Sequence, residues 1–110
     1  MRRACIDIGS NTTRLLVAEC DGERLLEVHQ ERSFTRIGQD QRGDGTISPS
    51  KLAEVVQVVV EQLQSARELG AVDVCGVATA SIRRAANGQA LIGAIDRACG
   101  LAVQVLSEQE

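Results

Sequence analysis

The sequence is almost without aromatic residues. Among its 110 residues Phe34 is the one aromatic side chain, and there is no tryptophan or tyrosine. Proteins that hold single-stranded nucleic acid stack its bases on aromatic rings, so a platform of that kind is excluded. A dominant charge is also lacking, because 12 lysines and arginines stand against 15 aspartates and glutamates, for a net charge of -3. We therefore expect no nucleic-acid partner held by bulk charge, and a phosphate ligand would need a local site.

Long apolar runs and targeting signals are missing as well. No segment approaches the run of about 18 apolar residues that spans a bilayer. Asp7 interrupts the short apolar stretch after Arg2 and Arg3, so no secretory signal is visible. We expect a cytoplasmic protein with no membrane partner. The cysteines form no Cys-x-x-Cys pair and have no histidine at metal-site spacing, so we expect reduced, buried thiols at Cys5, Cys20, Cys75 and Cys99.

The first third of the chain predicts three antiparallel strands. The turn residues Asp21 and Gly22 predict a hairpin closed by a type I′ turn. In the last of the three strands, Leu26, Val28 and Phe34 share one parity, which predicts one apolar face. The apolar runs place the strands at 4–8, 14–20 and 24–34.

The rest of the chain alternates helices and strands. The polar, glycine-rich stretch 38–46 predicts a surface loop. A long apolar stripe at helical spacing follows, with Ser48 as its N-cap, Pro49 at the first helical position and Gly70 as a left-handed C-terminal cap. The whole order is β-β-β-α-β-α-β, which predicts a single α/β domain with a layered sheet. Its later elements are a strand at 71–79, a short helical piece, a helix closed by Gly100, and a strand at 101–106.

The first candidate site follows the first strand. Asp7 ends the strand, and Gly9 lets the backbone approach a ligand closely. Ser10, Asn11 and Thr12 add donors, and consecutive turn amides can bind an anion, while Asp7 could orient a hydrated metal ion. An ordinary hairpin turn is an equally good explanation, and the sequence is not a Walker loop.

The second candidate site follows the strand at 71–79. Arg83 offers a guanidinium fork for phosphate oxygens, and Ser81 can add a donor at a helix start. Ligands of open α/β sheets bind at this end of the strands. The alternative is that Arg83 and Arg84 are solvated surface residues. Glutamates after the last strand could supply a general base, whereas His29 has no visible partner for a triad.

Several of these segments together resemble the exopolyphosphatase/guanosine pentaphosphate phosphatase family. That family belongs to the superfamily of acetate kinase, sugar kinases, Hsp70 and actin. The segments occur in family order along the whole chain, and their combination is specific although each piece is short. They are Ile6–Thr12, Thr35–Gly38, Ile47–Pro49, Val77–Gly88 and Val105–Ser107.

The resemblance implies a ribonuclease-H-like (actin-like ATPase) lobe with a mixed sheet. It also implies hydrolysis, with Mg²⁺, of terminal phosphate from inorganic polyphosphate or of the 5′ phosphate from guanosine pentaphosphate. Arg83 then has a catalytic role, because it neutralises charge as an in-line water attacks the phosphoryl group. The phosphate-binding residues implied are Gly9, Ser10, Asn11, Thr12, Thr79, Ser81 and Arg83.

The last residues depart from the family pattern. Glu108 follows Ser107 where the family has glycine, so the catalytic base is either Glu110 or a residue just past the printed sequence. Family members are several hundred residues long and work in a cleft between two lobes. The second phosphate loop of that cleft is absent from these 110 residues. We therefore expect an incomplete N-terminal lobe with little turnover of its own, which needs its second lobe or a second copy.

Three other interpretations stay open. A non-catalytic module could use Arg83 to sense polyphosphate or a nucleotide. An ATP-dependent kinase lobe of the same superfamily is disfavoured by the segment from Ser81 to Asn87. A bare assembly domain would associate with itself through its sheet edge or apolar faces.

Overall fold

The strands and longer helices follow one another in the predicted order. The structure, a computed structural model, describes residues 1–40 and 45–106. No helix in this described part is long and apolar enough to cross a membrane. The elements are β1 (Arg2–Ile8), β2 (Thr13–Asp21), β3 (Arg24–Ser33), α1 (Ile37–Asp40), α2 (Pro49–Glu68), β4 (Ala71–Ala78), α3 (Ala80–Arg84), α4 (Gly88–Cys99) and β5 (Val103–Val105).

The five strands form one mixed sheet in the order β3-β2-β1-β4-β5. β1 pairs antiparallel with β2, and β2 pairs antiparallel with β3. β1 and β4 are parallel neighbours, as are β4 and β5, so α2 and α4 each belong to a parallel crossover. The expected α/β class, the element order and the mixed sheet are confirmed.

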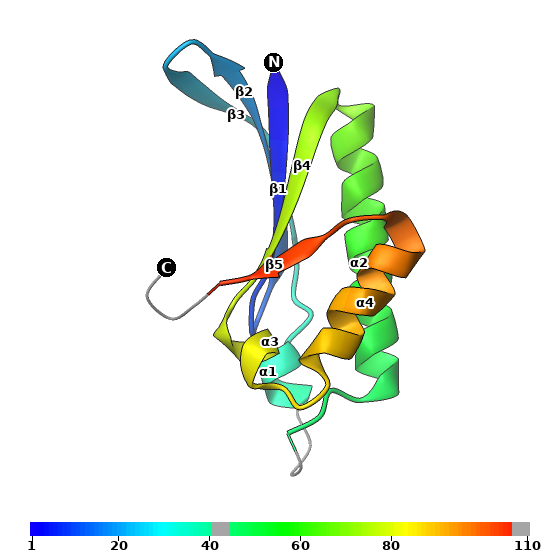
Figure 1. The fold of residues 1–110 in the computed structure, drawn as a ribbon. Coiled ribbons are helices and arrows are strands. Elements are labelled where there is room, and N and C mark those ends of the chain that lie inside the picture. The colour runs from blue at the N-terminus through cyan, green and yellow to red at the C-terminus, as the bar shows by residue number, and fades with distance from the viewer. Residues whose placement is uncertain (41–44, 107–110) are drawn as a thin grey trace.

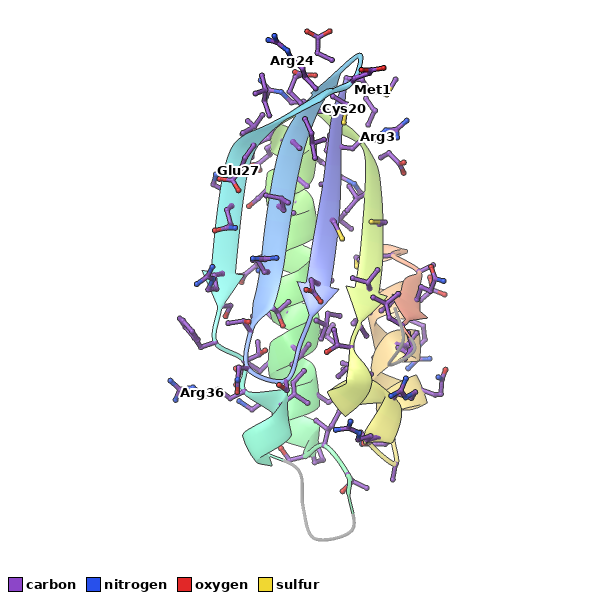
Figure 2. All side chains as sticks on the ribbon, turned by 90° about the vertical axis from the view of Figure 1, so that its left-hand side faces the viewer. Met1, Arg3, Cys20, Arg24, Glu27 and Arg36 are labelled. Atoms are coloured by element: carbon purple, nitrogen blue, oxygen red, sulfur yellow. The ribbon has the colours of Figure 1, made fainter. Side chains whose placement is uncertain are left out.

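The long helices α2 and α4 pack on one face of the sheet (Figure 1). Alternate residues of β1 point into this layer, where Ile6 and Ile8 are buried, while Cys5 and Asp7 face the other side. Figure 2 looks onto that other side, where the described residues place no long helix. A shallow hollow of about 300 Å³ lies on it, lined by Arg3, Ala4, Cys5, Leu16, Ala18, Cys20, Leu25 and Cys75.

Local signals fix both ends of α2 as predicted. The Ser48 hydroxyl accepts a hydrogen bond from the Lys51 amide at 3.2 Å, and Pro49 takes the first helical position. Gly70 has a φ of +84°, a conformation that glycine adopts without a side-chain clash. The Arg2 guanidinium donates to the Leu69 carbonyl at 2.8 Å, which ties the C-terminal end of the helix to β1.

The β2–β3 hairpin is confirmed, but two details of its prediction are wrong. Asp21 pairs with Arg24, so the two loop residues are Gly22 and Glu23, and only Gly22 has a positive φ. The turn is therefore not type I′, which needs two positive values. Val28 lies at a bulge, because Val17 pairs with His29 and Ala18 with Glu27. The extra residue breaks the parity of the strand, and its leucines stay exposed.

The stretch predicted as a loop at 38–46 begins with a helical turn. α1 occupies Ile37–Asp40, so the loop prediction is wrong there, and 41–44 lie outside the described residues. The Ile37 side chain is fully buried, and the Gly38 amide donates to the Ser10 carbonyl at 2.9 Å. Tertiary contacts of this kind hold a turn that its polar sequence does not predict.

All four cysteines are free thiols, as expected, but the prediction that they are buried is wrong, because none of them is. Cys75 is exposed and the other three are half-buried. Cys5 and Cys75 are direct neighbours on β1 and β4. Burial, together with the adjacent Cys75 thiol, raises the pKa of Cys5 to about 12. The Cys5 thiol is therefore protonated at neutral pH and is a poor nucleophile.

One asparagine links two segments that are far apart in the sequence. Asn87 accepts from the Ile47 amide at 2.8 Å and donates to the Ile47 carbonyl at 3.0 Å. We expect Asn87→Ala to lower the free energy of unfolding by about 1–3 kcal/mol, because both Ile47 groups lose their partner. Urea denaturation measures this free energy. The control is Gln89→Ala, at an exposed position in the first turn of α4, the helix that follows Asn87. Equal unfolding curves for the two variants would contradict the prediction.

Candidate functional site

The candidate site lies at the end of the sheet where β1 and β4 both finish. Because the two strands are parallel, with Ile8 paired to Ala78, their carboxyl ends meet at this edge. The β1–β2 loop, α1 and α3 gather there (Figure 1). Open α/β sheets bind their ligands at this end of their strands.

Gly9 and Thr79, predicted separately, lie against each other. The Thr79 amide donates to the Ile8 carbonyl at 3.1 Å, which brings Thr79 alongside the turn. The Gly9 amide donates to the Thr12 carbonyl at 2.8 Å and closes the turn. A Cβ atom at Gly9 would lie 3.2 Å from the Thr12 carbonyl oxygen and 3.9 Å from the Thr79 hydroxyl. Glycine therefore allows this close approach of Thr12 and Thr79, while the approach of a ligand to Gly9 stays a prediction.

Two neighbouring amides of the turn are directed away from α1. The Ser10 carbonyl accepts from the Gly38 amide, and the Asn11 carbonyl accepts from the Arg36 amide at 3.0 Å. In a planar trans peptide the N–H points opposite to the C=O, so the amides of Asn11 and Thr12 point to the other side. Within the described part of the chain, neither amide donates a hydrogen bond. Adjacent free amides of this kind can bind an anion.

The Asp7 carboxylate adds an unsatisfied acceptor beside the turn. It lies on the sheet face opposite α2, and its Oδ1 atom is buried without a hydrogen-bond partner among the described residues. These residues contain no cluster of three or more metal-ligating side chains. A carboxylate oxygen is a ligand type that suits Mg²⁺ and the water bound to it.

Arg83 lies at the same end of the sheet, in the last turn of α3. Its Nη1 atom donates to the Leu106 carbonyl at 3.1 Å, just after β5, and its side chain is exposed. Ser81 is in α3 too, whereas Ser107, Glu108 and Glu110 lie outside the described residues. His29, for which the sequence showed no partner, has an acidic one in Glu31, because its Nε2 atom is 2.8 Å from a carboxylate oxygen of that residue. No nucleophile completes a triad there among the contacts of the described residues.

Sequence reasoning assigned no site role to the segment that supports the turn. Arg36 and Gly38 belong to a motif of the resemblance, but their amides were not expected to hold the turn carbonyls. Arg36 is the one non-glycine residue of the described part with a positive φ, +53°. Figure 2 shows it where β3 ends, with its side chain directed outward. Its backbone, rather than its charge, contacts the site.

The strand order and the placement of the helices define a ribonuclease-H-like lobe with a candidate anion site at one edge. The same fold occurs in RuvC of Thermus thermophilus, with a TM-score of 0.52 and 16% identity over 99% of this chain and 66% of that one. The chain belongs to the Ppx/GppA phosphatase family, whose model matches residues 16–110. That range includes Thr79 and Arg83 and begins after the turn.

Two relatives agree with the family match. A crystal structure of the Aquifex aeolicus member of the Ppx/GppA family has a TM-score of 0.92 and 31% identity, over 98% of this chain and 35% of that chain. Exopolyphosphatase 1 of Mycobacterium leprae is 25% identical over 107 residues, which are 96% of this chain and 32% of the relative. The chain thus spans about a third of the length of these relatives.

Proposed function

We propose that the chain is the N-terminal, phosphate-binding lobe of a phosphoanhydride hydrolase. Its substrate class is inorganic polyphosphate or guanosine pentaphosphate, from which terminal phosphate is released. The observation that supports this most directly is the pair of free amides at Asn11 and Thr12, beside Gly9 and Thr79. Membership of the Ppx/GppA family, and the similarity to an exopolyphosphatase, support a phosphate chain as the anion.

In this proposal each residue of the site has a separate task. The amides of Asn11 and Thr12 bind oxygens of a terminal phosphate, and Ser10, Thr79 and Ser81 add further donors around it. Arg83 holds the phosphate chain and offsets the negative charge that grows as an in-line water attacks. Mg²⁺, when bound, neutralises charge on the phosphate oxygens. Asp7 accepts hydrogen bonds from the water around that ion.

The lobe alone is proposed to bind its ligand rather than turn it over. The family cleft has two lobes, and the chain covers about a third of the relatives' length. The candidate base, Glu110, lies outside the described residues. Turnover then depends on a second lobe or on a second copy of the chain. A non-catalytic phosphate-binding or regulatory module is the alternative, because the free amides of Asn11 and Thr12 can bind an anion without a catalytic base.

The test is a calorimetric titration with inorganic tripolyphosphate in the presence of Mg²⁺. We expect Arg83→Ala to weaken binding about tenfold, because a charge-assisted hydrogen bond to phosphate is lost. Arg97→Ala, in the last turn of α4, removes the same charge from another element and is the control. Absence of binding, or equal loss in both variants, would contradict the proposal.

Phosphate release from long-chain polyphosphate then separates the two candidate functions. Binding without release, in the chain alone, agrees with a lobe or a module. Release that disappears in Arg83→Ala would show a complete enzyme and would overturn the expected dependence on a second lobe. Recovery of release on adding a separately produced second lobe of a relative would favour the hydrolase over the module.

A further inference from the structure

Buried polar residues lie directly behind the Gly9–Thr12 turn. Gln62, in the middle of α2, is 3% exposed, and its Nε2 atom donates to the Thr13 carbonyl at 3.0 Å. The Thr13 hydroxyl is 2.9 Å from the hydroxyl of Thr35, and both threonines are fully buried. One glutamine on the helix layer thus contacts the first residue after the turn, and that residue contacts the segment before α1.

The same segment holds the turn carbonyls. Thr35 is followed by Arg36 and Gly38, whose amides donate to the carbonyls of Asn11 and Ser10. A Cβ atom at Gly38 would lie 3.2 Å from the Ser10 Cβ atom, so the two segments are in close contact. The hydrogen bonds therefore form a continuous path from Gln62, through Thr13 and Thr35, to the carbonyls that set the direction of the free amides.

Two unfavourable features of the described residues lie on this path. The Gln62 Oε1 atom is buried without a hydrogen-bond partner among these residues. Arg36 has a positive φ, which is strained for a residue with a side chain. An apolar residue at position 62 would bring no buried acceptor of its own, but the Thr13 carbonyl would lose this donor. An unsatisfied buried acceptor and a strained backbone next to one loop are typical of a site that serves function rather than stability.

We propose that Gln62 is a positioning residue that sets the direction of the Asn11 and Thr12 amides. It acts by holding the Thr13 carbonyl, and Thr35 continues its effect to the segment that binds the turn carbonyls. The positioning of the turn stands on the contacts alone. Only the identity of the anion rests on the proposed function.

The first test compares two glutamines of the same helix. Gln62→Met removes the amide but keeps the length of the side chain, and Gln64→Met does the same at an exposed position, where the amide contacts Glu68. We expect Gln62→Met to shift the backbone amide resonances of residues 9–12 and 38 while resonances of α4 stay in place. We also expect it to weaken tripolyphosphate binding about tenfold. Gln64→Met should change neither.

A second pair of variants guards against a folding defect in the first. Thr35→Val removes the hydroxyl, whereas Thr35→Ser keeps it, so Ser should restore the turn resonances and the tripolyphosphate affinity that Val loses. If the wild type does not bind tripolyphosphate, the proposed function fails, and the resonances of the turn alone decide the positioning role. Unchanged turn resonances in Thr35→Val and in a folded Gln62→Met, or shifts spread evenly over the sheet, would overturn it.

Discussion

Gly88→Ala is expected to unfold the chain or to lower its thermal stability severely. Gly88 is buried at the first position of α4, and a Cβ atom there would lie 2.1 Å from the Ile82 carbonyl oxygen. No real Cβ atom comes so close to backbone, so α3 and α4 must move apart. We expect the free energy of unfolding to fall by at least about 4 kcal/mol, because severe overpacking is among the few mechanisms that cause so large a loss. Circular dichroism during heating measures it.

Gly93→Ala is the matched control on the same helix. A Cβ atom at Gly93 would meet only the Arg97 guanidinium, at 3.2 Å, and that flexible side chain can move. Alanine also favours a helix over glycine by about 1 kcal/mol, so this variant should be neutral or stabilising. If the two alanine variants have the same melting temperature, the close packing of α3 on α4 is not the reason for a glycine at position 88.

The contrast between α2 and the segments around it shows which parts of the fold the sequence determines locally. α2 carries its own signals, a Ser48 cap, Pro49 and a left-handed Gly70, so its prediction holds at both ends. β3 and α1 depend on partners elsewhere. The bulge at Val28 is a feature of pairing with β2, and α1 is held by Ser10. Neither contact is visible in a window of neighbouring residues.

The candidate site divides in the same way. Gly9 and Thr79 follow predicted strands, and a parallel pairing of those strands is enough to expect them at one edge. Gln62 contacts Thr13 across 49 positions of sequence, and no motif marks it. A signal was present, however, because Gln62 stands three residues after Val59 and four before Ala66, on the buried face of the helix. A lone amide in an apolar stripe indicates a buried hydrogen bond.

Asp7→Asn is expected to separate stability from ligand binding. The carboxylate is half-buried and its Oδ1 atom has no hydrogen-bond donor among the described residues, so a neutral amide is easier to bury at this position. Without Mg²⁺ we expect the free energy of unfolding to rise by about 1 kcal/mol. If Asp7 orients the hydrated ion, Mg²⁺ should strengthen tripolyphosphate binding less in Asp7→Asn than in the wild type. We expect the ratio of the affinities with and without Mg²⁺ to fall about tenfold. Urea denaturation and calorimetry measure the two effects.

Opposite signs in these two measurements are what a functional carboxylate requires. Replacing a residue that supports the fold makes the protein less stable. Replacing a residue that serves a ligand weakens binding and leaves the stability of the protein unchanged or higher. Asp73→Asn on β4 removes the same charge from an exposed position and should change neither quantity. If Asp7→Asn is less stable and still binds tripolyphosphate in a Mg²⁺-dependent way, Asp7 is a structural residue. The ion would then be held by groups other than this carboxylate.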